Sequence, residues 1–235
     1  PASGAAEASR LLSSARSSRR SLSEHESKQL LSAYDIHVSR DIVSASRNEA
    51  AKAATSLGMP VVMKILSPEI MHKSDLGLVA IGVSGEREVR NTYDTLVSRA
   101  SEAAPHASID GVVVCEMVTG GVETVVGVAQ DDLFGPVVMF GLGGVLVELL
   151  QDVTFRIPPF DRTTARIMLG ELKGSPLLRG IRGRPACDTA ALVDVIMKVQ
   201  RLAVDMHSEL AELDINPLMV LPKGAVALDA LAVPT

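Results

Sequence analysis

The sequence predicts an α+β protein built from two sheet-based lobes. Short apolar runs of strand length occur among longer stretches with helical periodicity. Their order lacks the regular alternation of strand and helix that is typical of a doubly wound parallel sheet. Of the 235 residues, 47% are hydrophobic, which is sufficient for one large domain or for two smaller lobes.

Two helices are predicted from capping boxes near the amino-terminal end. Ser23 and Glu26 have the spacing of such a box, and so do Ser46 and Glu49. Gly58 ends the second helix, because glycine readily adopts the backbone conformation that terminates helices.

The remaining elements follow from apolar periodicity. Apolar runs predict strands at residues 61–65, 78–83, 112–118, 124–128, 137–140, 213–221 and 225–233. Residues 86–100 are predicted to form an amphipathic helix, because their apolar residues recur at helical spacing. Two further helices are predicted to begin at Asp161 and Asp188.

Composition excludes several classes of function. A net charge of -5 argues against nucleic-acid binding, which usually requires a basic face. No apolar run reaches the roughly 18 residues that a membrane span needs. The two cysteines form neither a metal-binding pattern nor a disulfide framework, so we expect a reduced, cytoplasmic setting.

Residues 1–21 are predicted to be a disordered linker or tail. Ser, Ala and Arg occupy 17 of the first 23 positions, a composition that buries little apolar surface. A mitochondrial transit peptide has a similar composition and is the alternative. The chain begins at Pro1 without an initiator Met, which favours a linker within a longer polypeptide.

Lys64 lies inside an apolar predicted strand, where lysine is uncommon. One interpretation is a lysine on the solvent face of an edge strand. The other is a strand lysine that extends into a cleft and holds a nucleotide phosphate.

The loop after this strand concentrates polar chemistry in the run His72-Lys73-Ser74-Asp75. Histidine can form a covalent phosphoryl intermediate and titrates near neutral pH. An ordinary polar turn is the alternative interpretation of this run.

Two glycine-containing turns are candidate ligand loops. The run Phe140-Gly141-Leu142-Gly143-Gly144 lets the backbone approach an anion closely, although a tight turn explains it equally well. Glu116 and Glu123 flank a second Gly-Gly turn, where they are either solvated turn residues or ligands of ribose hydroxyl groups.

Asp214, Asn216 and Asp229 are candidate residues for a metal site, and a turn-capping Asn-Pro with scattered carboxylates is the alternative. Asp214 and Asn216 alternate on one face of a predicted strand, and the following hairpin returns Asp229 to that face. Carboxylate and amide oxygens are ligands that Mg²⁺ prefers. Their place within otherwise apolar strands argues against scattered turn residues.

Taken together, these motifs resemble the ATP-grasp domain of acyl-CoA synthetases that form a nucleoside diphosphate. Succinyl-CoA synthetase β subunits are more distantly similar. The resemblance covers residues 22–235 and rests on residues 60–65, 72–75, 134–144 and 212–218. It implies an ATP-grasp fold with a nucleotide cleft between two lobes, residues 22–116 with a mobile histidine loop and residues 117–235 with the magnesium site.

The resemblance also implies roles in binding ATP or ADP. Lys64 matches the lysine that contacts the nucleotide phosphates, Glu116 the position that meets the adenine, and Glu123 a carboxylate that meets the ribose. Gly143 and Gly144 match a glycine-rich turn near the phosphates.

Four further residues match the phosphoryl-transfer machinery. Asn216 and Asp229 match the Mg²⁺ ligands, Asp214 an acidic residue that steadies phosphohistidine, and His72 a histidine that carries the phosphoryl group. One departure is visible, because Leu78 follows Gly77 where the family usually has a second glycine.

The implied function is the nucleotide half of an acid–thiol ligase. Nothing in the chain resembles the CoA-binding part, so the resemblance implies a CoA-binding α subunit or an upstream domain that handles the carboxylic acid and CoA. A regulatory ATP-grasp domain fused to a lysine acetyltransferase is the alternative. A carboxylate–amine ligase is disfavoured because it needs no loop histidine.

Overall fold

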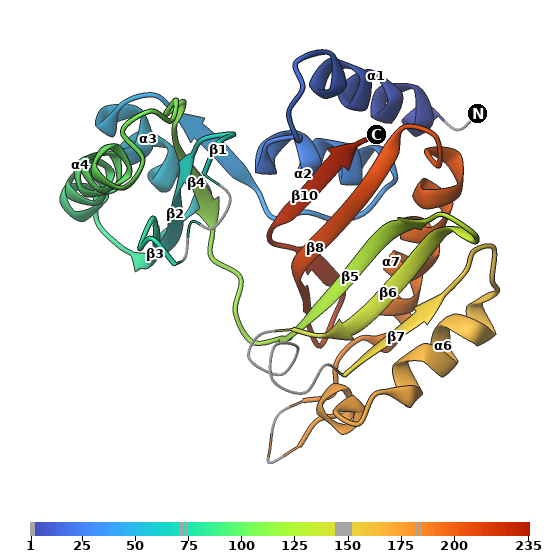
Figure 1. Ribbon diagram of the computed structural model, residues 1–235. Coiled ribbons are helices and arrows are strands. Elements are labelled where there is room, and N and C mark those ends of the chain that lie inside the picture. The colour runs from blue at the N-terminus through green and yellow to red at the C-terminus, as the bar shows by residue number, and fades with distance from the viewer. Residues whose placement is uncertain (1–2, 71–72, 74, 144–151, 182, 184) are drawn as a thin grey trace. The chain divides into compact units, whose positions relative to one another are not determined.

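The computed structural model describes residues 3–70, 73, 75–143, 152–181, 183 and 185–235. The chain divides into two compact units (Figure 1). Ser39–Thr119 forms one unit, and the segments before and after it together form the other. Each unit is built on an antiparallel sheet with helices, which confirms the α+β prediction.

The unit Ser39–Thr119 contains a four-stranded sheet in the order β1-β4-β2-β3. Its strands are β1 (Asp41–Ser44), β2 (Val61–Leu66), β3 (Val79–Val83) and β4 (Gly111–Glu116). Two helices, α3 (Arg47–Leu57) and α4 (Glu86–Ala103), pack on one face of it. Met63 and Ile65 point into this core, because alternate side chains of a strand face opposite sides.

The other unit contains a six-stranded sheet in the order β10-β8-β5-β6-β7, with β9 paired to β8. Its strands are β5 (Val122–Asp131), β6 (Gly135–Leu142), β7 (Val153–Arg156), β8 (Leu210–Val220), β9 (Ala225–Ala227) and β10 (Ala230–Pro234). Among the described residues of this unit, the helical elements are α1 (Ser3–Ser17), α2 (Glu24–Ala33), α6 (Arg162–Glu171), the 3₁₀ helix η1 (Ser175–Arg179) and α7 (Thr189–Asp205).

The amino-terminal segment is a helix, so the prediction of a disordered linker over residues 1–21 is wrong. Ala8, Leu12 and Ala15 of α1 are at most 1% exposed and belong to the same core as the six-stranded sheet. Together with the buried Ala5 and Leu11, they form an apolar stripe along one face of the helix. Gly4 permits a close approach to α2, since a Cβ there would lie 1.8 Å from the Ala33 carbonyl oxygen.

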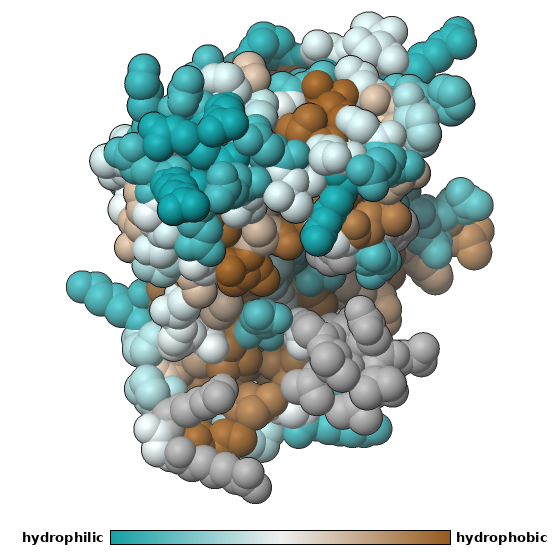
Figure 2. Space-filling model, turned by 90° about the vertical axis from the view of Figure 1, so that its left-hand side faces the viewer, coloured by the Kyte–Doolittle hydropathy of each residue, from teal (hydrophilic) through white to brown (hydrophobic). Residues whose placement is uncertain are grey.

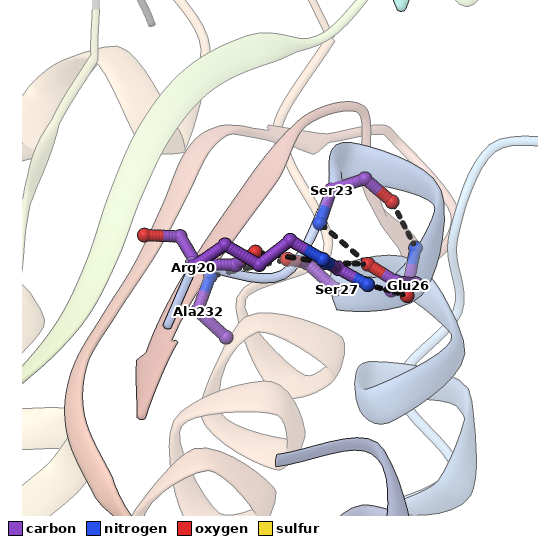
Figure 3. Close-up of polar contacts among 6 residues, drawn as sticks. Arg20, Ser23, Glu26, Ser27 and Ala232 are labelled. Carbon is purple, nitrogen blue, oxygen red and sulfur yellow. Dashed lines mark hydrogen bonds and ion pairs between the residues drawn. The ribbon is translucent and has the colours of Figure 1, made fainter. Parts of the chain in front are cut away.

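Polar contacts fasten the connection between α1 and α2 (Figure 3). The Arg20 guanidinium donates to both carboxylate oxygens of Glu26, at 2.6 and 2.8 Å. Ser23 and Glu26 form the predicted capping box at the start of α2. The Leu22 amide donates to the Ala232 carbonyl, and the Ala232 amide donates to the Ser27 hydroxyl, so β10 holds this segment.

The predicted lobe boundaries are also wrong. Residues 22–38, assigned to the first lobe, belong to the unit of the six-stranded sheet, and residues 117–119 belong to the other unit. The reason is packing, because α2 lies against α1 and β10. In addition, Val38 forms an isolated parallel bridge with Ala227, the last residue of β9.

The surface carries scattered apolar side chains. The face in Figure 2 is mostly hydrophilic and has separate apolar patches. Of the residues that the structure describes, Ile81 and Leu133 are the most exposed large hydrophobic ones, at 72% and 87%. Among the described residues, none of the helices combines the length and the hydropathy that crossing a membrane requires.

Candidate functional site

A polar cluster lies on β8 beside the start of β10. Asp214 and Asn216 alternate with the buried residues Leu213 and Ile215, so their side chains leave the sheet on the face opposite the α7 core. Ala230 pairs with Ile215 and Leu231 with Asp214, and the Asn216 amide donates to the Asp229 carbonyl at 3.2 Å. The structure therefore brings Asp214 together with the two predicted metal ligands, Asn216 and Asp229.

The pKa of Asp214 is raised above its ordinary value. Burial of the carboxyl group is the largest cause, and the neighbouring charges of Glu212 and Asp229 add to it, while a hydrogen bond from Asn216 opposes the rise. A partly buried carboxylate among other carboxylates is destabilised without a counter-charge. A cation would remove this penalty.

The donor set fits magnesium better than zinc. In the described part of the chain, no group of three or more His, Cys, Asp or Glu residues is arranged to hold a metal. Zinc usually requires three or four such ligands, whereas Mg²⁺ takes one or two carboxylates together with water and substrate phosphates. Asp229 and the amide oxygen of Asn216 are compatible with that pattern.

Glu123 and Gly143 meet where β5 begins and β6 has just ended. The Gly143 amide donates to the Glu123 carbonyl at 2.7 Å. A Cβ at Gly143 would lie 2.9 Å from the Glu123 carbonyl carbon, so this approach requires glycine. The exposed Glu123 pairs with Met219 of β8, while Gly144 lies outside the described residues.

Lys64 is buried in the four-stranded sheet, with 9% of its surface exposed. Its strand β2 lies between β4 and β3, so the interpretation as a solvent-facing lysine on an edge strand is wrong. It shares its sheet face with a small apolar cluster of Leu66, Val113 and Cys115. Burying an ammonium group costs free energy. A buried lysine is therefore usually either paired with another group or functional.

Glu116 is held by Arg40, which is not among the predicted site residues. The Arg40 amide donates to Glu116 Oε1 at 2.9 Å, and its guanidinium donates to Oε2 at 2.8 Å. The Glu116 amide in turn donates to the Arg40 carbonyl at 2.9 Å. Nothing in the sequence signals this pairing, because it depends on where β1 lies beside β4.

The predicted phosphoryl carrier His72 lies outside the described residues. The end of its loop is described, and the Leu78 amide donates to the Lys73 carbonyl at 2.8 Å. Leu78 is fully buried in the core of its unit. The leucine that departs from the family pattern therefore anchors the end of this loop.

The predicted residues divide between the two units. Asp214, Asn216, Asp229, Glu123 and Gly143 belong to the unit of the six-stranded sheet, and Lys64 and Glu116 to the unit Ser39–Thr119.

Comparisons with known proteins identify the family of the chain. The model of the ATP-grasp domain family matches residues 13–233. The β subunit of ADP-forming acetate–CoA ligase I from Pyrococcus furiosus is 41% identical over 225 residues, covering 96% of this chain and 97% of that subunit. ADP-forming acetate–CoA ligase I from Archaeoglobus fulgidus is 41% identical over 87% of this chain, which spans 30% of that longer protein.

Solved structures are similar over nearly the whole chain. Acetyl-coenzyme A synthetase 1 from Ca. Korarchaeum cryptofilum, in complex with coenzyme A and Ca-AMPCP, has a TM-score of 0.92 and 40% identity, covering 96% of this chain and 98% of that chain. The same enzyme with Mg-AMPPCP, whose phosphohistidine segment points towards the nucleotide site, has a TM-score of 0.85 and 37% identity, covering 97% of this chain and all of that chain. The chain therefore belongs to the ATP-grasp domain family, in the branch that contains the β subunits of ADP-forming acetate–CoA ligases.

Proposed function

We propose that this chain is the nucleotide-binding part of an ADP-forming acyl-CoA ligase and transfers a phosphoryl group between ATP or ADP and a histidine. The observation that carries the proposal is the cluster of Asp214, Asn216 and Asp229, in which the pKa of Asp214 is raised by burial and neighbouring carboxylates. Such a cluster is stabilised by a divalent cation. The ligase names of the similar proteins support the same activity.

In the forward half-reaction, a ring nitrogen of His72 attacks the γ-phosphorus of ATP. The bond between that phosphorus and the bridging oxygen of ADP breaks, and ADP leaves with the electron pair. A neutral imidazole is available for this attack near pH 7. Asp214 is assigned a hydrogen bond to the other ring nitrogen, which favours the charged imidazole that results.

The other residues position and neutralise the nucleotide. Lys64 is assigned to the phosphates and Glu123 to the ribose. The turn at Gly143 and Gly144 is assigned a place near the phosphates, where the Gly143 amide already donates to the Glu123 carbonyl. Asn216 and Asp229 would hold Mg²⁺, which supplies charge neutralisation of the phosphates when it is bound. Because Arg40 engages the Glu116 carboxylate, we assign the adenine contact of Glu116 to its main chain.

The CoA chemistry is assigned to a partner. One matched relative is a β subunit and another is a protein of which this chain spans 30%, so the partner is either an α subunit or a fused domain. We assign the complex to the cytoplasm, because both described cysteines are free thiols. The ligase names of the relatives favour an enzyme over a regulatory domain of an acetyltransferase fusion.

Incubation with γ-labelled ATP and Mg²⁺ tests the proposal. We expect a protein-bound label that is stable to alkali and labile to acid, as a phosphoramidate is, and that maps to His72. The His72→Ala variant should bind nucleotide normally and lose the label. His106→Ala is a matched control, because His106 is an exposed histidine in the same unit.

The label is measured both with this chain alone and with a CoA-binding partner added. Equal labelling of the His72→Ala variant would refute the carrier role. Absence of nucleotide binding by the unmodified chain would refute the proposed function itself.

A further inference from the structure

A pocket of about 300 Å³ lies among α6, η1 and the start of α7. Its volume is at the lower end of the range of small-molecule sites. Buried apolar side chains form part of its lining, namely Leu169, Leu178 and Val193. These residues belong to the core on the α7 side of the six-stranded sheet, whereas Asp214 and Asn216 point from the opposite face. The pocket is therefore separate from the proposed magnesium site.

Four polar side chains line the same pocket, those of Arg166, Ser175, Arg179 and Thr189. Among the residues that the structure describes, none of these side chains has a hydrogen bond or an ion pair. Two guanidinium groups at one pocket repel each other unless an anion lies between them. Arginine forks match the geometry of phosphate oxygens, and hydroxyl groups can donate hydrogen bonds to the same oxygens.

The acidic residues nearby are already engaged. Glu171 is paired with Arg156, and Asp194 with Arg162. Asp188 caps α7 through the Ala191 amide and also accepts from the Gly224 amide. Residues 161–194 contain six basic and four acidic residues, although the whole chain has a net charge of -5. The positive charge at the pocket is thus not neutralised by neighbouring carboxylates.

We propose that this pocket binds a small phosphate monoester. Arg166 and Arg179 hold the dianionic phosphate, Ser175 and Thr189 donate to its oxygens, and the apolar side chains contact the ester group. The apolar lining distinguishes this ligand from inorganic phosphate, because burying a short alkyl chain adds favourable free energy.

Calorimetric titration of the full chain with n-butyl phosphate and with inorganic phosphate tests the proposal. Mg-ADP is present throughout, so that the nucleotide site is occupied. We expect n-butyl phosphate to bind about ten times more tightly than inorganic phosphate. Equal affinities for the two would overturn the assignment to an ester, and no binding of either would overturn the site.

Charge removal is the first structural test. Arg166→Gln and Arg179→Gln should each weaken n-butyl phosphate binding about tenfold, because each removes a charge-assisted hydrogen bond. Arg87→Gln is the matched control, since Arg87 is an exposed arginine on α4 in the other unit. Unchanged affinity in both pocket variants would reject the proposal.

Gly170 allows a steric test that preserves the fold. It lines the pocket, and a Cβ at this position would have no neighbour within 4 Å. Gly170→Leu should abolish binding by filling the pocket, while Gly170→Ala should retain it, and both favour the helix over glycine. The affinity for Mg-ATP, measured by the same titration, should be unchanged in all these variants. Loss of n-butyl phosphate binding alone therefore concerns this pocket, whereas loss of Mg-ATP binding would concern the proposed function.

Discussion

At the scale of single residues, the most informative feature is the electrostatic cost at Asp214. Its carboxyl group is partly buried beside Glu212 and Asp229, and its pKa is raised as a result. Because its surroundings disfavour the charged form, Asp214 stabilises the folded chain less than a neutral residue at the same position would. Such costs are typical of sites whose ligand provides the missing charge.

Asp214→Asn should stabilise the fold and impair phosphoryl transfer. The pKa of Asp214 is higher in the folded chain than in the unfolded chain. The free-energy penalty of ionising this carboxyl group in the folded chain is therefore absent below the unfolded pKa. It develops as the pH rises through the folded pKa. Without Mg²⁺ at pH 7, we expect the variant to have a higher free energy of unfolding than the unmodified chain, and this difference should disappear near pH 3. Urea denaturation at several pH values measures it. Asp132→Asn, at an exposed carboxylate in a turn, is the control. A destabilised Asp214→Asn variant at pH 7 would contradict the argument.

Loss of both Asn216 and Asp229 should weaken binding of Mg-nucleotide. Replacing both with alanine removes an amide and a carboxylate ligand, so we expect the affinity to fall at least roughly tenfold. Binding of nucleotide in EDTA should change much less. Calorimetry with and without Mg²⁺ gives both values, and circular dichroism checks the fold. Unchanged affinity for Mg-nucleotide would remove these residues from the metal site.

At the scale of secondary structure, local signals located helix starts well. The predicted N-caps Ser23, Ser46, Asp161 and Asp188 all accept a backbone hydrogen bond at the start of a helix. Capping is a local interaction, so it is encoded within four residues. The two short strands β1 and β7 were not predicted. Each has four residues and is defined by pairing with a distant strand.

The burial of α1 leads to a direct prediction. Leu12→Ala should reduce the free energy of unfolding by about 2–4 kcal/mol, because a buried leucine is replaced by a cavity. Ser13→Ala on the exposed side of the same helix should have little effect. Thermal or urea unfolding distinguishes the two outcomes. Equal stability of Leu12→Ala and the unmodified protein would mean that α1 is not docked in solution.

At the scale of the whole molecule, the topology is an insertion. The unit Ser39–Thr119 is continuous in sequence and has its own sheet, helices and core. The other unit is assembled from the segments on both sides. Contiguous units with their own core often fold independently.

The segment Ser39–Thr119 should therefore fold when it is expressed alone. We expect cooperative unfolding with a stability of roughly 0.05–0.15 kcal/mol per residue. Dispersed amide resonances and a sigmoidal denaturation curve are the measurements. As a control, residues 120–235 without the amino-terminal segment should be less stable than the full unit, because α1 and α2 contribute to its core. A molten excised segment would show that it depends on the remaining chain.

The sequence by itself determined the α+β class, most strands, the helix caps and the candidate residues on β8. These features depend on neighbours within a few residues or on alternation along one strand. Only the tertiary structure decided that α1 is ordered, that α2 belongs to the unit of the six-stranded sheet and that Arg40 holds Glu116. It also decided that Lys64 is buried in a central strand. The physical reason is that burial and ion pairing depend on contacts between residues far apart in the chain, which composition and local spacing do not encode.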